Sequence, residues 1–178
     1  TRKCSALLED ILKVRKILLT TSCTDALEMS SLLVEIHDGD EVIVPSFTFV
    51  STVNAFVLRG ARPVFADIRP DTLNMDENQV EELITDRTKA IVPVHYAGVA
   101  CEMDSILVIA QRHGLMVIED SAQAYGSGYP RRPLGALGAR MGFMMEPVVE
   151  VPLCTGAAGS VIASAANMRR IRVWRMAT

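Results

Sequence analysis

Three short stretches of the sequence carry polar or aromatic residues directly after an apolar run. They are TTSCTDAL (residues 20–27), PSFTFVST (45–52) and EDSAQ (119–123). Hydroxyl, carboxylate and amide groups in such places can bind a small ligand, because ligands of open parallel sheets collect at the carboxyl ends of the strands. If the three apolar runs are parallel strands, the three stretches share one edge of a sheet.

The acidic pair Glu119 and Asp120 ends the run LMVI, which indicates a fully buried strand. A buried carboxylate is costly unless it is paired or hydrogen-bonded. Two kinds of partner fit equally well. One is a cation such as the pyridinium nitrogen of a flat cofactor, with Gln123 reaching a ring substituent. The other is the set of backbone amides in the turn that follows.

The other two stretches have a ligand interpretation and a plainer structural one. At a helix start, the free N–H groups near Thr24 could hold a phosphate. Taken alone, these residues favour an ordinary N-terminal cap, in which Ser22 or Thr24 bonds amides of the first turn. Phe47 and Phe49 follow a strand, and we expect at least one of them to pack in the core.

Short apolar runs rich in β-branched residues alternate with segments of helical period. The expected strands are 16–20, 41–45, 63–68, 90–96 and 115–120, and the expected helices are about 24–36, 49–58, 77–84 and 103–113. Parallel neighbours need connections of about a dozen residues that usually carry a helix. The sequence therefore predicts an α/β fold of three layers, α/β/α, with a mostly parallel sheet.

Composition narrows the class of partner. The 178 residues are 49% hydrophobic and 22% charged with a net charge of −3, which indicates a globular domain without a basic face for nucleic acid or a membrane surface. No apolar run approaches the roughly 20 residues that span a bilayer, and the N-terminal residues lack the apolar core of a signal peptide, so the expected location is cytoplasmic. The four cysteines have no CxxC spacing, so we expect reduced thiols and no metal site.

Several motifs in order resemble the sugar-nucleotide aminotransferases of the DegT/DnrJ/EryC1/StrS family, which use pyridoxal 5'-phosphate (PLP). They are SCTDALEMSSLL, GDEVIVPSFTFVSTVNAFVLRGARPVFADIRPDTLNMD, IVPVHYAGVACEMD and VIEDSAQAYGS, within residues 16–138. The resemblance implies the large domain of a PLP-dependent transferase of fold type I. It also implies amino transfer from glutamate to a dTDP-4-keto-6-deoxyhexose, in antigen or deoxysugar biosynthesis, by a homodimer.

The resemblance assigns five cofactor-binding residues. The helix start at Thr24 and Asp25 would bind the cofactor phosphate through backbone N–H groups, and Phe49 would stack on the ring. Asp120 would pair with the pyridine nitrogen, and Gln123 would contact the ring hydroxyl. Asp25 departs from the family, whose members commonly have a small residue there, and its charge would repel a phosphate.

A larger departure concerns the lysine that binds the cofactor aldehyde in the family. After LGALG (134–138), its expected position falls near Val149, and a phosphate-binding serine is expected near Met144. The lysines of the chain all come earlier: Lys3, Lys13, Lys16 and Lys89. The last histidine is His113, so the dehydratase variant of the family, which uses histidine, is not supplied either.

No catalytic residue can therefore be assigned, and two readings follow. The chain is an aminotransferase whose activity is impaired, or it is a non-catalytic homologue that at most binds PLP or a partner subunit. By resemblance, residues 139–155 diverge, 156–178 are weakly similar, and the small C-terminal domain is missing. Two compensating reading-frame shifts would produce such a local replacement.

Some further residues have an ordinary interpretation beside a functional one. Lys89 opens a strand at the opposite edge and is expected to be an exposed turn residue. His95 could touch a ligand or serve as a hydrogen-bonded structural residue. Tyr96, Tyr125 and Tyr129 could contact sugar or pack, and the arginines of residues 169–175 are expected on a solvated helix face.

Overall fold

The computed structural model describes residues 2–12, 14, 16–130, 132–137, 141–144 and 162–165. Seven of the described strands form one sheet in the order β1-β9-β8-β5-β4-β2-β3. Their bounds are β1 Ile17–Leu18, β2 Glu41–Pro45, β3 Arg62–Ala66, β4 Thr88–Ile91, β5 Met116–Ser121, β8 Met141–Met144 and β9 Ile162–Ala165. Strands β3, β2, β4, β5 and β8 run parallel, and β9 pairs antiparallel with both β8 and β1.

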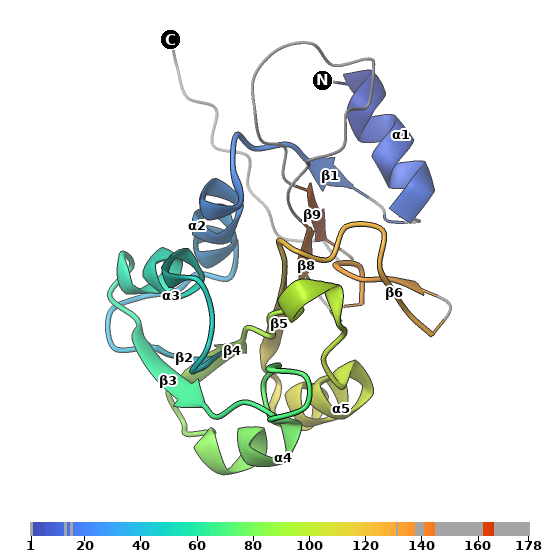
Figure 1. The fold of residues 1–178 in the computed structure, drawn as a ribbon. Helices are drawn as coiled ribbons and strands as arrows, with labels where there is room; N and C mark the ends of the chain where they lie inside the picture. Colours follow the sequence, from blue (N-terminus) through green and yellow to red (C-terminus); the bar gives the residue numbers. More distant parts are fainter. Residues whose placement is uncertain are drawn as a thin grey trace, which may run out of the picture.

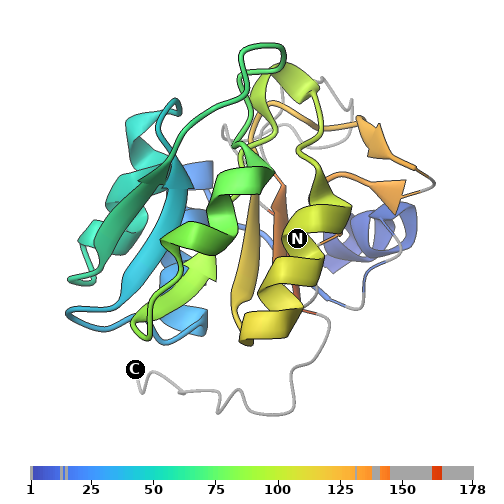
Figure 2. The same cartoon turned by 90° about the horizontal axis from the view of Figure 1, so that it is seen from below.

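Helices cover both faces of the sheet, with α2 and α3 on one face and α4 and α5 on the other (Figures 1 and 2). The helices are α1 Arg2–Leu12, α2 Cys23–Leu33, α3 Val50–Val57, α4 Glu77–Val80 and α5 Met103–His113, with 3₁₀ turns η1 Glu81–Leu83 and η2 Tyr96–Gly98. Strands β6 Gly128–Tyr129 and β7 Arg132–Pro133 form a separate hairpin. The predicted three-layer α/β/α fold with a mostly parallel sheet is confirmed.

The alternation of side chains along each strand divides the core into two parts. On β2, Val42 and Val44 pack with Leu27 of α2 and Phe56 of α3. Ile43 points the other way and packs in the cluster that α4 and α5 cover. All five β2 residues are buried, and each apolar side chain among them contributes about 1.5–3 kcal/mol of transfer free energy. Because β2 is packed on both faces, the residues that follow its carboxyl end are held in fixed positions.

Two predicted elements have the predicted bounds, namely strand 41–45 and helix 103–113. Helix α5 ends there because Gly114 adopts a left-handed conformation (φ 68°) that caps it. The strand expected over 90–96 stops at Ile91, since Pro93 has no amide hydrogen for the ladder. Pairing with β5 resumes at the bridge between Val94 and Asp120.

The structure contains described elements that the sequence pattern did not predict, namely α1, the β6–β7 hairpin, β8 and β9. In the part of the chain that is described, no helix combines the length and apolar character needed to cross a bilayer. The predicted divergence of residues 139–155 and weak similarity of 156–178 fall mostly outside the described residues, apart from β8 and β9.

Candidate cofactor-binding site

The three polar stretches meet around the carboxyl end of β5. Asp120, near the end of β5, is 4% exposed. One carboxylate oxygen, Oδ2, accepts a hydrogen bond of 2.7 Å from the hydroxyl of Thr52, in the first turn of α3. The other oxygen, Oδ1, accepts from the amide of Ala122 at 3.1 Å and lies 3.8 Å from the thiol of Cys23, at the start of α2.

The sequence left two kinds of partner open for Asp120, a cation and the backbone amides of the following turn. The contacts settle this question only in part. The amide of Ala122 belongs to the following turn, so the backbone interpretation is confirmed for one oxygen. Every hydrogen-bond donor that reaches Asp120 from the described residues is neutral. The charge of a nearly buried carboxylate is therefore hydrogen-bonded without being paired, which leaves the site suited to a cationic ring nitrogen.

Glu119 serves a structural purpose on the opposite face of the sheet. Its side chain is fully buried and accepts hydrogen bonds from Gly135 N (2.9 Å), Leu137 N (2.7 Å) and His95 Nε2 (3.1 Å). His95 Nδ1 accepts from Cys101 N at 3.2 Å, so this nitrogen is unprotonated and Nε2 carries the hydrogen. The structural interpretation of His95 is confirmed, since its side chain is also completely buried.

At the start of α2 the predicted helix cap is present. Ser22 is the N-cap, and its hydroxyl accepts from the amide of Asp25 at 3.0 Å. Neither the amide nor the hydroxyl of Thr24 donates to a described residue outside the helix, so both are available to a ligand. The Asp25 carboxylate accepts a hydrogen bond from the hydroxyl of Thr21. A phosphate at this helix start would thus meet an open amide at Thr24 and a negative charge at Asp25.

The expectation that Phe47 or Phe49 packs in the core is wrong. Phe49 is 72% exposed and Phe47 is 43% exposed. Both follow the last buried residue of β2, where the chain has passed beyond the packed layers and turns into α3. The ring of Phe47 packs against Tyr96 with centroids 5.0 Å apart and planes tilted by 58°, whereas that of Phe49 is free to cover a flat ligand.

Gln123 is exposed, and Ala97 fixes the orientation of its side-chain amide. The Oε1 atom of Gln123 accepts from the amide of Ala97 at 2.7 Å. Ala97 adopts a left-handed conformation (φ 51°), which turns its N–H toward Gln123. Because the oxygen is occupied, the Nε2 hydrogens are the part of Gln123 that remains for a ligand, and they can donate to a ring oxygen.

The described lysines near the sheet lie away from this edge. Lys89 is at the amino end of β4, half exposed, with Nζ 4.0 Å from Asp40. Lys16 precedes β1, and its Nζ lies 3.4 Å from Glu9. The prediction that Lys89 is an exposed residue at the opposite edge is confirmed. The positions near Val149 lie outside the described residues.

Strand β8 reaches the same edge as the site. Its backbone pairs in parallel with β5, so that Phe143 lies beside Asp120 and Met144 beside Ser121. Met144, where the resemblance expects a serine, therefore ends its strand beside the site.

The described cysteines, Cys4, Cys23 and Cys101, are not joined in disulfides. Burial raises the pKa of the Cys101 thiol to about 12, so this thiol is an unreactive part of the core.

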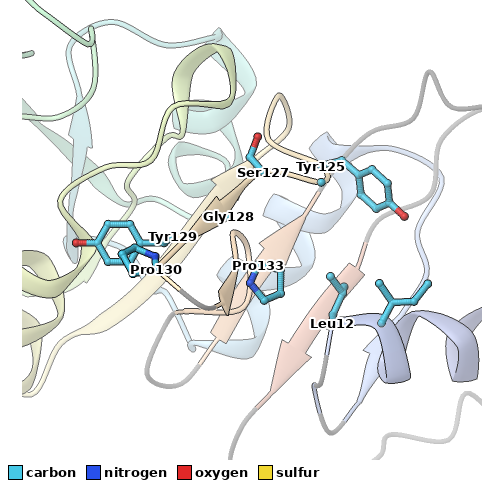
Figure 3. A pocket seen from close by; sticks show the side chains of 9 residues that line it. Leu12, Tyr125, Ser127, Gly128, Tyr129, Pro130 and Pro133 are labelled. Carbon is cyan, nitrogen blue, oxygen red and sulfur yellow. The ribbon is translucent and has the colours of Figure 1, made fainter.

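A separate cavity of about 750 Å³ lies between the end of α1 and the β6–β7 hairpin (Figure 3). Tyr125 and Tyr129 line it, together with Ile11 and Leu12 of α1. Tyr125 follows Gln123 by two residues, so the cavity adjoins the site along the chain. The other tyrosine singled out by the sequence, Tyr96, packs on Phe47.

The role of Thr52 was not predicted from the sequence, although this residue ends the stretch PSFTFVST. The usable signal was the spacing of Thr48 and Thr52, which places both hydroxyls on one side of a helix start. In the structure their oxygens are 2.9 Å apart.

Comparison with known proteins agrees with this geometry. The family profile of the DegT/DnrJ/EryC1/StrS aminotransferases matches residues 2–175, so the chain belongs to this family. Spore coat polysaccharide biosynthesis protein SpsC of Bacillus subtilis is 48% identical over 122 residues, which make up 68% of this chain and 31% of SpsC. GDP-perosamine synthase of Caulobacter vibrioides is 43% identical over 155 residues, or 84% of this chain and 41% of that protein.

Among solved structures, NtdA of Bacillus subtilis, determined with bound pyridoxamine phosphate (PMP), has a TM-score of 0.79 and 31% identity. The match covers 93% of this chain and 37% of NtdA. The chain thus spans less than half the length of each of these relatives. The expected family and its PLP-dependent class are confirmed, whereas the implied substrate, a dTDP-4-keto-6-deoxyhexose, finds no support in the names of these relatives.

The residues at the site fit a pyridoxal-type cofactor. A nearly buried carboxylate with neutral partners suits the ring nitrogen, and an exposed aromatic ring beside it suits the ring face. An amide with free Nε2 hydrogens suits the ring hydroxyl, and an open helix start suits the phosphate. The misfit is the Asp25 carboxylate.

Proposed function

We propose that this chain carries the cofactor-binding part of a sugar aminotransferase and holds PLP or PMP at the carboxyl end of β5. The observation that carries the proposal is the Asp120 carboxylate, 4% exposed and bonded only by neutral donors of the described chain. Burial of an unpaired carboxylate destabilises the folded state unless a cation binds next to it.

Each residue has a distinct task in this proposal. Asp120 pairs with the pyridine N–H and keeps that nitrogen protonated, and Phe49 covers the ring face. Gln123 donates an Nε2 hydrogen to the ring hydroxyl, while Thr24, with Asp25 beside it, receives the phosphate at the start of α2. When bound, the cofactor supplies an electron sink for proton removal from the carbon that bears the amine.

The proposed substrate class is a nucleotide-linked keto sugar, with glutamate as the amino donor. The similarity to GDP-perosamine synthase, whose name gives a nucleotide-linked amino sugar, and to SpsC, named for polysaccharide biosynthesis, supports the class. Within it we keep dTDP-4-keto-6-deoxyhexose as the proposed member, and we propose a cytoplasmic homodimer.

A second function, cofactor binding without turnover, is favoured by one observation. No lysine occurs after Lys89, and Lys89 lies at the amino edge of the sheet. Amino transfer requires a primary amine that can bind the cofactor aldehyde and move a proton at the substrate carbon. We propose that this chain alone binds the cofactor reversibly and does not complete the transfer.

The test separates the two functions. The purified chain is incubated with PLP, reduced with borohydride and digested, and its peptides are mapped by mass spectrometry. We expect reversible binding and no stoichiometric pyridoxyl adduct on any lysine. A single full adduct, on Lys89 or another lysine, would contradict the non-catalytic reading.

A further inference from the structure

A chain of two hydroxyl groups connects helix α3 to the carboxylate of Asp120. Thr52 is 1% exposed, and its Oγ1 lies 2.7 Å from Asp120 Oδ2 and 2.9 Å from Thr48 Oγ1. An ionised carboxylate can only accept, so the hydroxyl of Thr52 donates to Asp120. Having used its hydrogen, Thr52 must accept from Thr48. The direction of both hydrogen bonds is therefore fixed.

We propose that Thr52, aligned by Thr48, is a positioning residue that holds the Asp120 carboxylate for the cofactor nitrogen. This inference rests on the proposed function. Thr52 itself touches no reacting atom in this assignment and acts through Asp120.

Positioning matters here because Asp120 has few other restraints. Its Oδ1 atom is held by one amide, from Ala122, and by a thiol at 3.8 Å. Without Thr52, Oδ2 would have no donor among the described residues, and the carboxylate could turn about its terminal bond. A rotated carboxylate would meet a ring nitrogen at a poorer angle, and hydrogen bonds weaken steeply with angle.

Thr52 also connects the two groups that would fix the ring in space. The amide of Thr52 donates to the carbonyl of Phe49 at 3.0 Å, so both residues belong to one turn at the start of α3. Phe49 would set the plane of the ring, and Asp120 would set the position of its nitrogen. The hydrogen bond from Thr52 to Asp120 therefore connects the start of α3, where Phe49 lies, with β5, which contains Asp120.

The experiment uses PMP as the probe, because PMP has no aldehyde and its binding needs no lysine. Affinity is measured by fluorescence titration of the full chain, and the protonation of the pyridine nitrogen is followed by the ¹⁵N shift of labelled PMP across pH. The variants are Thr52→Val, which keeps shape and removes the hydroxyl, Thr52→Ser, which keeps the hydroxyl, and Thr48→Val.

Thr88→Val is the matched control. Thr88 is a threonine of similar burial (6% exposed) at the amino end of β4, and its hydroxyl accepts from Thr85 N at 2.9 Å. Loss of this hydroxyl should lower the free energy of unfolding without changing the cofactor site. Any general effect of removing a buried hydroxyl is thereby separated from an effect on Asp120.

We expect Thr52→Val to bind PMP about tenfold more weakly, because a carboxylate that is no longer held in place would make a poorer charge-assisted hydrogen bond with the ring nitrogen. The pyridine nitrogen of PMP bound to this variant should lose its proton at lower pH than in the wild type. Thr52→Ser should restore both properties, Thr48→Val should show a smaller change in the same direction, and Thr88→Val should match the wild type.

Unchanged affinity and ¹⁵N titration in a folded Thr52→Val variant would overturn the positioning role while leaving the proposed function intact. If Thr52→Val does not fold, Thr48→Val takes its place, and wild-type behaviour in that variant would overturn the role. Failure of the wild-type chain to bind PMP would contradict both the proposed function and this inference.

Discussion

Glu119 and Asp120 are neighbours in the chain, yet their carboxylates lie on opposite faces of the sheet and have different surroundings. Glu119 accepts from the amides of Gly135 and Leu137, which fasten residues 135–137 to β5, and from Nε2 of His95. Asp120 lies on the α2 and α3 face, where a hydroxyl, an amide and a thiol reach it. The alternation of side chains along a β-strand therefore separates a structural acid from the acid that we propose binds the cofactor, although the two are consecutive residues.

The first prediction concerns the structural acid. Glu119→Gln should lower the free energy of unfolding by about 3 kcal/mol, because an amide NH₂ would face a backbone N–H that needs an acceptor. Urea denaturation followed by circular dichroism measures this. Glu82→Gln is the control, since Glu82 is exposed, and it should change stability by less than about 0.5 kcal/mol. Equal stabilities of the two variants would count against the role of Glu119.

The second prediction concerns pH. Hydrogen bonds from Thr85 and then Arg87 lower the pKa of Glu41 below its usual value. A carboxyl whose pKa is lower in the folded state adds stability above its unfolded pKa, and that stability disappears as the pH falls through the folded pKa. Acidification from about pH 6 to about pH 3 should therefore reduce the urea midpoint of the wild type more than that of Glu41→Gln. If acidification lowered the urea midpoints of the two proteins equally, Glu41 would not be the source of the pH dependence.

The third prediction addresses the misfit at the helix start. Asp25→Ser should bind PMP several-fold more tightly, by roughly 1 kcal/mol, because it removes a negative charge beside the proposed phosphate position. Asp86→Ser removes the same charge from an exposed turn at the amino edge of the sheet and should leave the affinity unchanged. Titrations at low and high salt give the measurement, and the gain should shrink as salt screens the charge. A gain of equal size in both variants would indicate a general effect of net charge.

The fourth prediction tests the exposed ring. Phe49→Ala should weaken PMP binding by about 2- to 12-fold through lost stacking, with little change in thermal stability, because Phe49 is 72% exposed. Phe65→Ala removes another exposed phenylalanine, on β3, and should leave the PMP affinity unchanged. Fluorescence titration and thermal denaturation are compared for both. Wild-type affinity in Phe49→Ala would exclude ring stacking at this position.

The fold could be predicted from the sequence where burial is two-sided and the pattern is strong. Strand 41–45 has an apolar run with clear turn residues around it, and helix 103–113 ends at a glycine that favours the left-handed conformation. The strand at 90–96 was predicted too long because its apolar residues continue past Pro93, which interrupts pairing without changing hydropathy.

The sequence indicated which stretches form the site, but it did not indicate all the contacts between their side chains. The position of Asp120 after a buried run indicated a carboxylate with a special partner, and the edge shared with α2 and α3 followed from parallel topology. The role of Thr52 depends on a contact across 68 residues, which no local pattern contains. Phe47 and Phe49 were misjudged because aromatic residues beside a strand are usually buried, whereas here the chain has already left the packed layers.

If Asp120 makes this edge of the sheet a cofactor site, PMP titration should distinguish the wild type from the Asp120→Asn variant. Asparagine keeps the size and an acceptor oxygen but has no charge to pair with a pyridinium nitrogen. We expect saturable binding by the wild type with one PMP per chain, and at least about tenfold weaker binding by Asp120→Asn, or roughly 1.4 kcal/mol. Equal PMP affinities of the wild type and a folded Asp120→Asn variant would contradict it.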